Sequence, residues 1–105
     1  MNPYIYTFIR NDLKAEQKIV QLGHATWEAG QVFEKPSETA SLVLLHANDE
    51  PDLLSIAEKL DEKGIEYVMF YEPDLPGYTA ICTRPVYSKN ERSFFRQWEL
   101  YSHIS

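Results

Sequence analysis

The sequence is poor in the residues that build covalent or metal-containing sites. Cys82 is the only cysteine among 105 residues, so the chain cannot form an intramolecular disulfide or a cluster of thiolate metal ligands. We interpret Cys82 as a buried packing residue, because nothing next to it in the sequence would lower the pKa of its thiol. There is also no apolar run of about 18 residues and no signal-peptide pattern. We therefore expect a cytoplasmic protein without metal, cofactor or membrane association.

Positive charge is also scarce. The chain has 10 Lys and Arg against 16 Asp and Glu, which gives a formal net charge of −6. This balance argues against strong attraction to nucleic acid, because neutralisation of phosphates drives such binding. The acidic residues are concentrated in residues 49–74, so the rest of the chain is nearly neutral. A local basic patch there would allow weak, salt-sensitive binding of a polyanion.

The order of the predicted elements indicates the fold class. Apolar, β-branched and aromatic runs predict strands at residues 4–9, 41–46, 65–71 and 78–83. The first two lack alternation, which is typical of strands covered on both faces. Helices are predicted at residues 15–33, between Asp49 and Gly64, and after the capping box formed by Ser88 and Glu91. This order predicts an α/β fold: a single-domain four-stranded mixed β-sheet with helices on both faces, and an antiparallel last strand pair. We expect the tail after Tyr101 to be frayed.

The helix predicted at residues 15–33 carries two stripes of side chains at helical spacing. The apolar stripe, which we expect to be buried, consists of Ile19, Leu22, Thr26, Ala29 and Phe33. The polar stripe consists of Gln17, Gln21, His24, Glu28 and Gln31. A solvated flank is the ordinary interpretation of such a polar stripe. Gly23 and Gly30 favour a functional one, because glycine weakens a helix unless another backbone or a ligand approaches closely.

Three basic residues converge at the start of this helix. Arg10 leaves the end of the first predicted strand, and Lys14 and Lys18 lie on the first turns of the helix. The free backbone N–H groups of a helix N-terminus already favour an anion. The sequence therefore predicts a local anion-binding region here.

Short motifs in this region resemble a known family. Residues 10–13 read R-N-D-L and residues 20–25 read V-Q-L-G-H-A, followed by Y-E-P at 71–73 and T-A-I-C-T-R-P at 79–85. In their order and their placement, these motifs resemble the type 2 peptidyl-tRNA hydrolase superfamily, nearest to its divergent peptidyl-tRNA hydrolase domain-containing branch. The resemblance spans nearly the whole chain and implies one domain of that fold at residues 1–105. The chain departs from the family in a shorter loop before the helix, which puts Lys18 out of register with the family lysine, and in Glu72, which replaces an aspartate.

The resemblance implies hydrolysis of the ester that joins a peptide, or an N-blocked amino acid, to the 3′ end of tRNA. Such a reaction needs an oriented water, hydrogen-bond donors for the oxyanion, and anchoring of the tRNA phosphates. His24 would act as the base or hold the water, Gln21 and Lys18 would donate to the oxyanion, and Glu72 would orient the base or the water. The candidate tRNA-binding residues are Arg10 and Lys14.

Other classes of function stay open from the sequence. The same residues could serve a binding module that recognises a tRNA end, a peptide or a protein without turnover. A structural or dimerising protein is a third hypothesis, and a homodimer would need an apolar interface. Aromatic residues at helical spacing are more often part of a core. Those that could form a dimer interface here are Tyr78, Phe94, Phe95, Trp98 and Tyr101.

Overall fold

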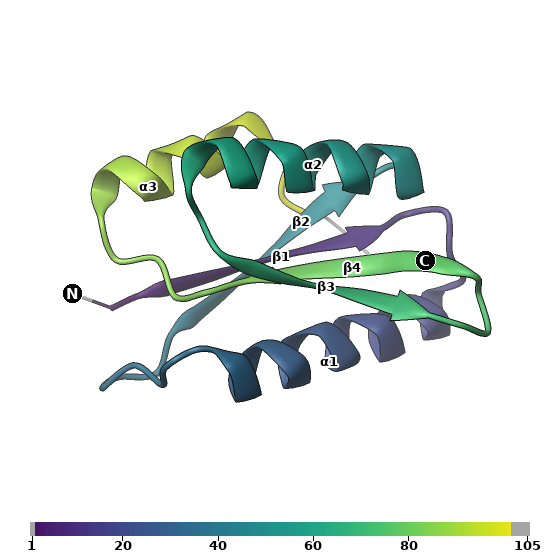
Figure 1. Cartoon of the computed structure of the whole chain (residues 1–105), viewed down its shortest axis with the longest axis horizontal. Coiled ribbons are helices and arrows are strands. Elements are labelled where there is room, and N and C mark those ends of the chain that lie inside the picture. The colour runs from purple at the N-terminus through teal and green to yellow at the C-terminus, as the bar shows by residue number, and fades with distance from the viewer. Residues whose placement is uncertain (1, 102–105) are drawn as a thin grey trace.

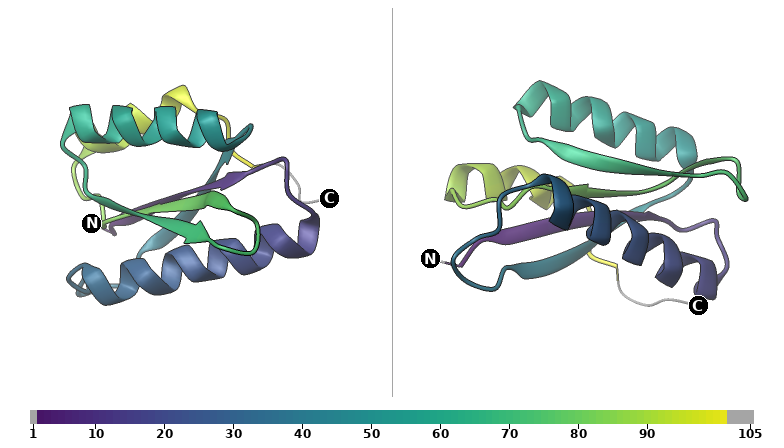
Figure 2. Two further views of the ribbon diagram at one scale, coloured as in Figure 1. Left: turned by 45° about the vertical axis from the view of Figure 1, so that its right-hand side comes forward. Right: turned by 60° about the horizontal axis from the view of Figure 1, so that its bottom comes forward.

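The computed structural model describes residues 2–101 and has the predicted fold class. Four strands form one mixed sheet in the order β2-β1-β4-β3. Helix α1 covers one face of this sheet, and α2 and α3 cover the other (Figures 1 and 2). No helix within residues 2–101 is long and apolar enough to span a bilayer. In chain order the elements are β1 Tyr4–Arg10, α1 Ala15–Val32, β2 Ser41–Ala47, α2 Glu50–Lys63, β3 Tyr67–Glu72, β4 Gly77–Thr83, α3 Lys89–Phe94 and the 3-10 helix η1 Phe95–Gln97.

The strand directions agree with the prediction. β1 and β2, which are joined through α1, pair in parallel along their full length. β4 pairs antiparallel with both β1 and β3, so the last pair of strands is a hairpin. The chain after η1 runs along the outer edge of β2, where Tyr101 N donates to Leu44 O at 2.9 Å. The expectation of a frayed tail lies outside the described residues.

The prediction that the second strand is buried on both sides is wrong for its first half. β2 lies at an edge of the sheet, with β1 as its neighbour. Ser41 and Leu42 at its start are exposed, and only Leu45 and Ala47 are buried. The run of consecutive apolar residues in β2 therefore correctly predicted a parallel strand. It did not predict which parts of that strand are exposed to solvent.

α2 packs on the sheet as its sequence predicts. The Asp49 side chain accepts a hydrogen bond from Asp52 N at 2.9 Å, which caps the first turn. Gly64 ends the helix in the left-handed conformation, at φ 80°, which glycine adopts without a steric penalty. The four residues of the predicted apolar face are all buried in the larger of two hydrophobic clusters: Leu53, Ile56, Ala57 and Leu60.

The buried face of α1 differs from the prediction by a rotation of about one residue. Ile19, which we expected to be buried, is 59% exposed, whereas Lys18 and Gln21 are each 3% exposed. Ala25 and Ala29 complete the face, and these small side chains fit closely against β1 and β4. Two polar side chains can be buried here because each has hydrogen-bond partners, which offset the cost of removing them from water.

The glycines of α1 have open surroundings in this chain. Apart from the two chain neighbours and the nearby backbone of α1 itself, no atom lies within 4 Å of a Cβ built on Gly23 or Gly30. The close approach that we expected at these glycines is therefore not made by residues 2–101.

The packing role of Cys82 is confirmed and leads to a prediction. Its side chain is 1% exposed, and burial raises the pKa of the thiol to about 12. The thiolate is the nucleophile, so we expect iodoacetamide at neutral pH to leave the native protein unmodified. Mass spectrometry should detect alkylation only after denaturation in guanidinium chloride. Equal modification of the native and denatured protein would contradict the buried position.

Candidate active site

A chain of hydrogen bonds links three elements at the end of the molecule where α1 begins. The Thr79 hydroxyl of β4 donates to Gln21 Oε1 of α1 at 2.7 Å. Gln21 Nε2 in turn donates to Glu72 Oε2, at the end of β3, at 3.1 Å. Since an ionised carboxylate can only accept, Glu72 fixes the amide nitrogen of Gln21 toward itself, and the Gln21 oxygen then faces the Thr79 hydroxyl, which donates to it. Residues 58 positions apart in sequence thus hold one amide group in a defined orientation.

A β-bulge brings Thr79 to this position. In the hairpin, Tyr71 is opposite Tyr78, and Phe70 is opposite Ala80, so Thr79 is the additional residue of β4. Bulges re-aim side chains and occur often beside active sites. Thr79 is fully buried, and its hydroxyl is satisfied by Gln21.

Hydrogen bonds connect the turn of this hairpin to α2 and β1. Glu50 accepts a hydrogen bond from Tyr78 N at 2.7 Å, and Arg10 donates to Tyr78 O at 3.2 Å. A Cβ on Gly77 would lie 2.7 Å from the Glu50 carboxylate, so glycine at this position leaves room for that carboxylate. These contacts place the end of β3, with Glu72, opposite the first turns of α1.

His24 lies beside this hydrogen-bond chain at the surface. Its ring stacks on Phe70 of β3, with the ring centroids 4.5 Å apart and the planes at 1°. The side chain is exposed to solvent, one turn after Gln21 on the same helix. Stacking restrains the imidazole without sealing it, so a solvent-accessible base is compatible with the geometry.

The Glu72 carboxylate is stabilised in its charged form. The hydrogen bond from Gln21 lowers its pKa most, and the Asp74 N–H adds to this effect, while partial desolvation opposes it. The charge of His24 contributes a smaller lowering of the same pKa. Glu72 is therefore ionised at neutral pH and is suited to stabilising a positive imidazolium nearby.

Lys18 lies on the same buried side of α1 as Gln21, in a separate group of polar side chains. Its ammonium donates to Asn11 Oδ1 at 3.0 Å and to the Tyr101 hydroxyl at 2.7 Å. The Tyr101 hydroxyl also donates to Asn11 Oδ1 at 2.7 Å. The lysine is thus held at the start of α1 by the loop after β1 and by the C-terminal segment.

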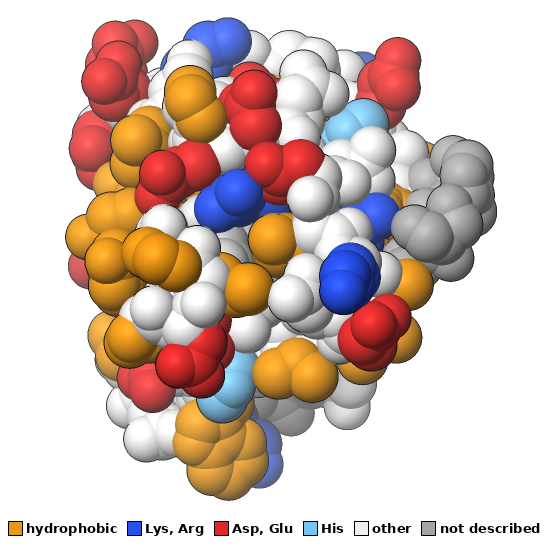
Figure 3. All heavy atoms as spheres, turned by 90° about the vertical axis from the view of Figure 1, so that its right-hand side faces the viewer, with side chains coloured by type: hydrophobic (Ala, Val, Ile, Leu, Met, Phe, Trp, Pro, Cys, Tyr) orange, Lys and Arg blue, Asp and Glu red, His pale blue; other side chains and the backbone are white. Residues whose placement is uncertain are grey.

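The two predicted tRNA-binding residues differ in their availability. Arg10 makes two hydrogen bonds of 2.9 Å to the Asp12 carboxylate. These bonds are the largest cause of a raised pKa for Arg10 and of a lowered pKa for Asp12. Lys14 is exposed at the N-cap position, directly before α1. Figure 3 views the molecule from this end and shows basic side chains lying singly among acidic and apolar ones. The surface charge is therefore compatible with weak rather than strong attraction of a polyanion.

The structure brings together Gln21, His24 and Glu72, whereas Lys18, one turn earlier on α1, lies in a separate group with Asn11 and Tyr101. The sequence did not point to Thr79, Asn11 or Phe70, which orient these groups. Thr79 lies in the motif at residues 79–85 and is one of two threonines in β4, but the sequence did not indicate that its hydroxyl contacts Gln21. Within residues 2–101, no group of three or more His, Cys, Asp or Glu side chains is arranged to hold a metal ion.

The fold and this cluster define a single-domain α/β protein with a polar site at one end of a four-stranded sheet. No family model matches the chain, and no curated protein matches it. Among solved structures, the chain is similar to Atu0240, a protein of unknown function from Agrobacterium tumefaciens strain C58. The TM-score is 0.65 at 13% sequence identity, over 97% of this chain and 99% of that one. At this identity the similarity shows a shared fold only.

Proposed function

We propose that this protein is a cytoplasmic hydrolase that cleaves the ester between a peptide, or an N-blocked amino acid, and the 3′ end of tRNA. The observation that carries the proposal is the hydrogen-bond chain from Thr79 through Gln21 to Glu72 beside an exposed His24. Gln21, His24 and Glu72 belong to the motifs that resemble type 2 peptidyl-tRNA hydrolases. Their convergence from distant parts of the sequence supports a common role.

The arrangement suits ester hydrolysis in a specific way. His24, exposed and restrained by Phe70, takes a proton from the attacking water. The ionised Glu72 stabilises the imidazolium that forms. Gln21 uses one amide N–H on Glu72 and keeps a second for the oxyanion of the tetrahedral intermediate. Lys18 adds a positive charge near the start of α1 that favours the same oxyanion.

Lys14 is the proposed phosphate anchor with the clearest test. Replacing Lys14 by glutamine is expected to raise KM with little change in kcat, because the side chain would contact tRNA phosphate rather than the reacting ester. The ratio of mutant to wild-type KM should shrink as salt rises, since exposed charge contacts are screened. The measurement is initial release of free tRNA from N-acetylaminoacyl-tRNA at several salt concentrations.

The matched control is Lys35→Gln, because Lys35 is also an exposed lysine but follows the far end of α1. Its KM should equal that of the wild type at every salt concentration. An equal rise in KM for both variants would mean that overall charge, rather than a site at the start of α1, governs binding.

A binding module without turnover is the second candidate, and one observation favours it. The cations of Arg10 and Lys18 are engaged by Asp12 in one case and by Asn11 and Tyr101 in the other. Groups committed in this way support the local structure and leave less charge for a transition state. This second function would be supported if the wild type shows no turnover of N-acetylaminoacyl-tRNA but binds tRNA, and if replacing each candidate residue weakens that binding by a similar, modest factor.

A further inference from the structure

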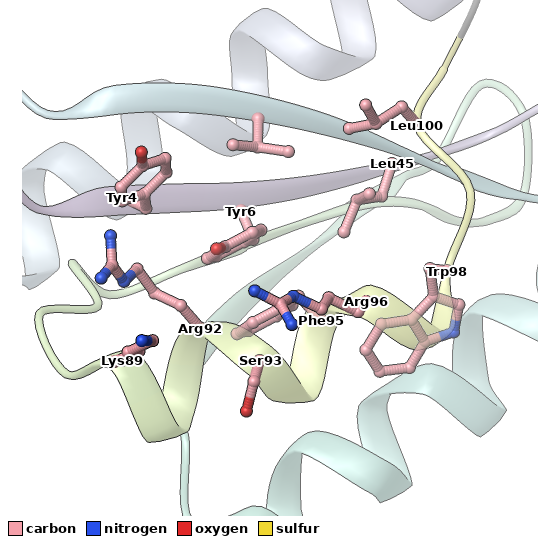
Figure 4. A pocket seen from close by; sticks show the side chains of 11 residues that line it. Tyr4, Tyr6, Leu45, Lys89, Arg92, Ser93, Phe95, Arg96, Trp98 and Leu100 are labelled. Atoms are coloured by element: carbon pink, nitrogen blue, oxygen red, sulfur yellow. The ribbon is translucent and has the colours of Figure 1, made fainter.

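A hollow beside α3 lies on the face of the sheet opposite α1, away from the candidate active site. It has a volume of about 380 Å³ and is bounded by β1, β2, α3, η1 and Leu100 (Figure 4). A cavity of this size is in the range that holds one small organic molecule. The residues that line it are basic or uncharged, although the chain as a whole is acidic.

Three basic side chains line this hollow. Lys89, Arg92 and Arg96 follow one another at intervals of three and four, so they lie along one side of α3 and η1. No acidic side chain lines the hollow, and within residues 2–101 none forms an ion pair with any of the three. The hollow is therefore locally positive in a chain whose net charge is −6.

Arg92 is only partly satisfied in this position. Its guanidinium lies 5.0 Å from the centre of the Tyr4 ring, and Figure 4 shows the side chain extended toward that tyrosine. Its Nε is buried and has no hydrogen-bond partner within the described chain. A buried donor without an acceptor is unfavourable, so an incoming anion would improve the hydrogen bonding of this residue.

Aromatic rings form the other wall. Tyr6 stacks on Phe95 with the ring centroids 3.7 Å apart and the planes at 1°, and Trp98 lines the same hollow. Burial raises the pKa of Tyr6, while the charges of Arg92 and Arg96 act in the opposite direction. Both guanidinium groups thus lie close enough to the Tyr6 hydroxyl to influence it, and the protonated hydroxyl is a further donor.

We propose that this hollow binds a small phosphate monoester that carries a flat aromatic group, of the nucleoside monophosphate class. Three positively charged side chains provide more charge than is needed to bind one carboxylate. They are suited to the two negative charges of a phosphate monoester. The aromatic wall supplies the surface on which a base stacks. This site is independent of the proposed ester hydrolysis, because it uses other residues on the opposite face of the sheet.

The test uses adenosine monophosphate and the fluorescence of Trp98. The chain has two tryptophans, and Trp27, exposed on α1, is replaced by phenylalanine so that Trp98 alone reports. We expect saturable quenching with a Kd between about 10 μM and 1 mM. Adenosine and inorganic phosphate, each lacking half of the recognised chemistry, should bind at least about tenfold more weakly.

Arg92→Gln and Arg96→Gln are each expected to weaken binding by about tenfold, whereas the remote Lys35→Gln should stay within about twofold. Arg92 packs on Tyr4 and its replacement could disturb folding, but Arg96 is exposed, so its variant keeps the test decisive. Thermal melting verifies that each variant is folded. The proposal is overturned if adenosine monophosphate causes no saturable change, if Arg96→Gln binds as tightly as its parent, or if inorganic phosphate binds equally well.

Discussion

Replacing Gln21 by alanine is expected to lower kcat for release of tRNA from N-acetylaminoacyl-tRNA by about 10²-fold or more, the usual scale for loss of an oxyanion donor. The variant loses the amide that Thr79 orients and that Glu72 accepts. His24→Ala is expected to lose a similar factor, because the general base is removed. KM should change little in both variants, since the amide and the imidazole act on the reacting centre.

Gln31→Ala is the matched control for Gln21→Ala. Gln31 is the same residue type on the same helix, but it is exposed near the far end of α1. Its kcat should equal that of the wild type. Circular dichroism of all three variants checks that α1 is intact, and equal kcat values for Gln21→Ala and Gln31→Ala would remove Gln21 from the catalytic assignment.

Replacing Phe8 by alanine is expected to lower the free energy of unfolding by about 3–5 kcal/mol. Phe8 lies at the centre of β1, is 0% exposed, and packs against Trp98 and Phe95 with ring centroids 5.1 and 6.4 Å away. Removal of the ring leaves a cavity where the sheet meets α2 and η1, and such a rigid core collapses only in part. The measurement is urea denaturation followed by circular dichroism.

Trp27→Ala is the control for the removal of a large aromatic side chain. Trp27 is 72% exposed on α1, so its replacement should change the free energy of unfolding by no more than about 0.5 kcal/mol. A similar loss in both variants would show that the aromatic packing around Phe8 does not dominate the stability of this domain.

Much of the fold could be predicted because its signals are local. The capped start of α2, Gly64 after its end and the turn residues before Gly77 each act within a few positions of the chain. The order of strands in the sheet is not local, and the edge position of β2 left Leu42 exposed against expectation. The predicted buried face of α1 was also wrong because of a non-local contact. Gln21 is buried against Thr79, which is distant in the sequence.

The candidate site could be predicted only in part. The motif pair in α1 singled out Gln21 and His24, and the end of the third predicted strand singled out Glu72. The geometry that joins them depends on a bulge in β4, and bulges leave no reliable pattern in a single sequence. Lys18 was placed on the expected helix, but its partner Tyr101 comes from the other end of the chain.

A single-turnover experiment tests the proposed catalytic site most directly. The pure protein is mixed in excess with N-acetylaminoacyl-tRNA, and free tRNA is followed against spontaneous ester hydrolysis in the same buffer. With protein in excess at a saturating concentration, the observed rate does not depend on affinity for the substrate or on product release. The geometry of Gln21, His24 and Glu72 predicts release by the wild type well above the spontaneous rate, with about 10²-fold slower release by His24→Ala. Release by the wild type at the spontaneous rate would contradict catalysis at this site.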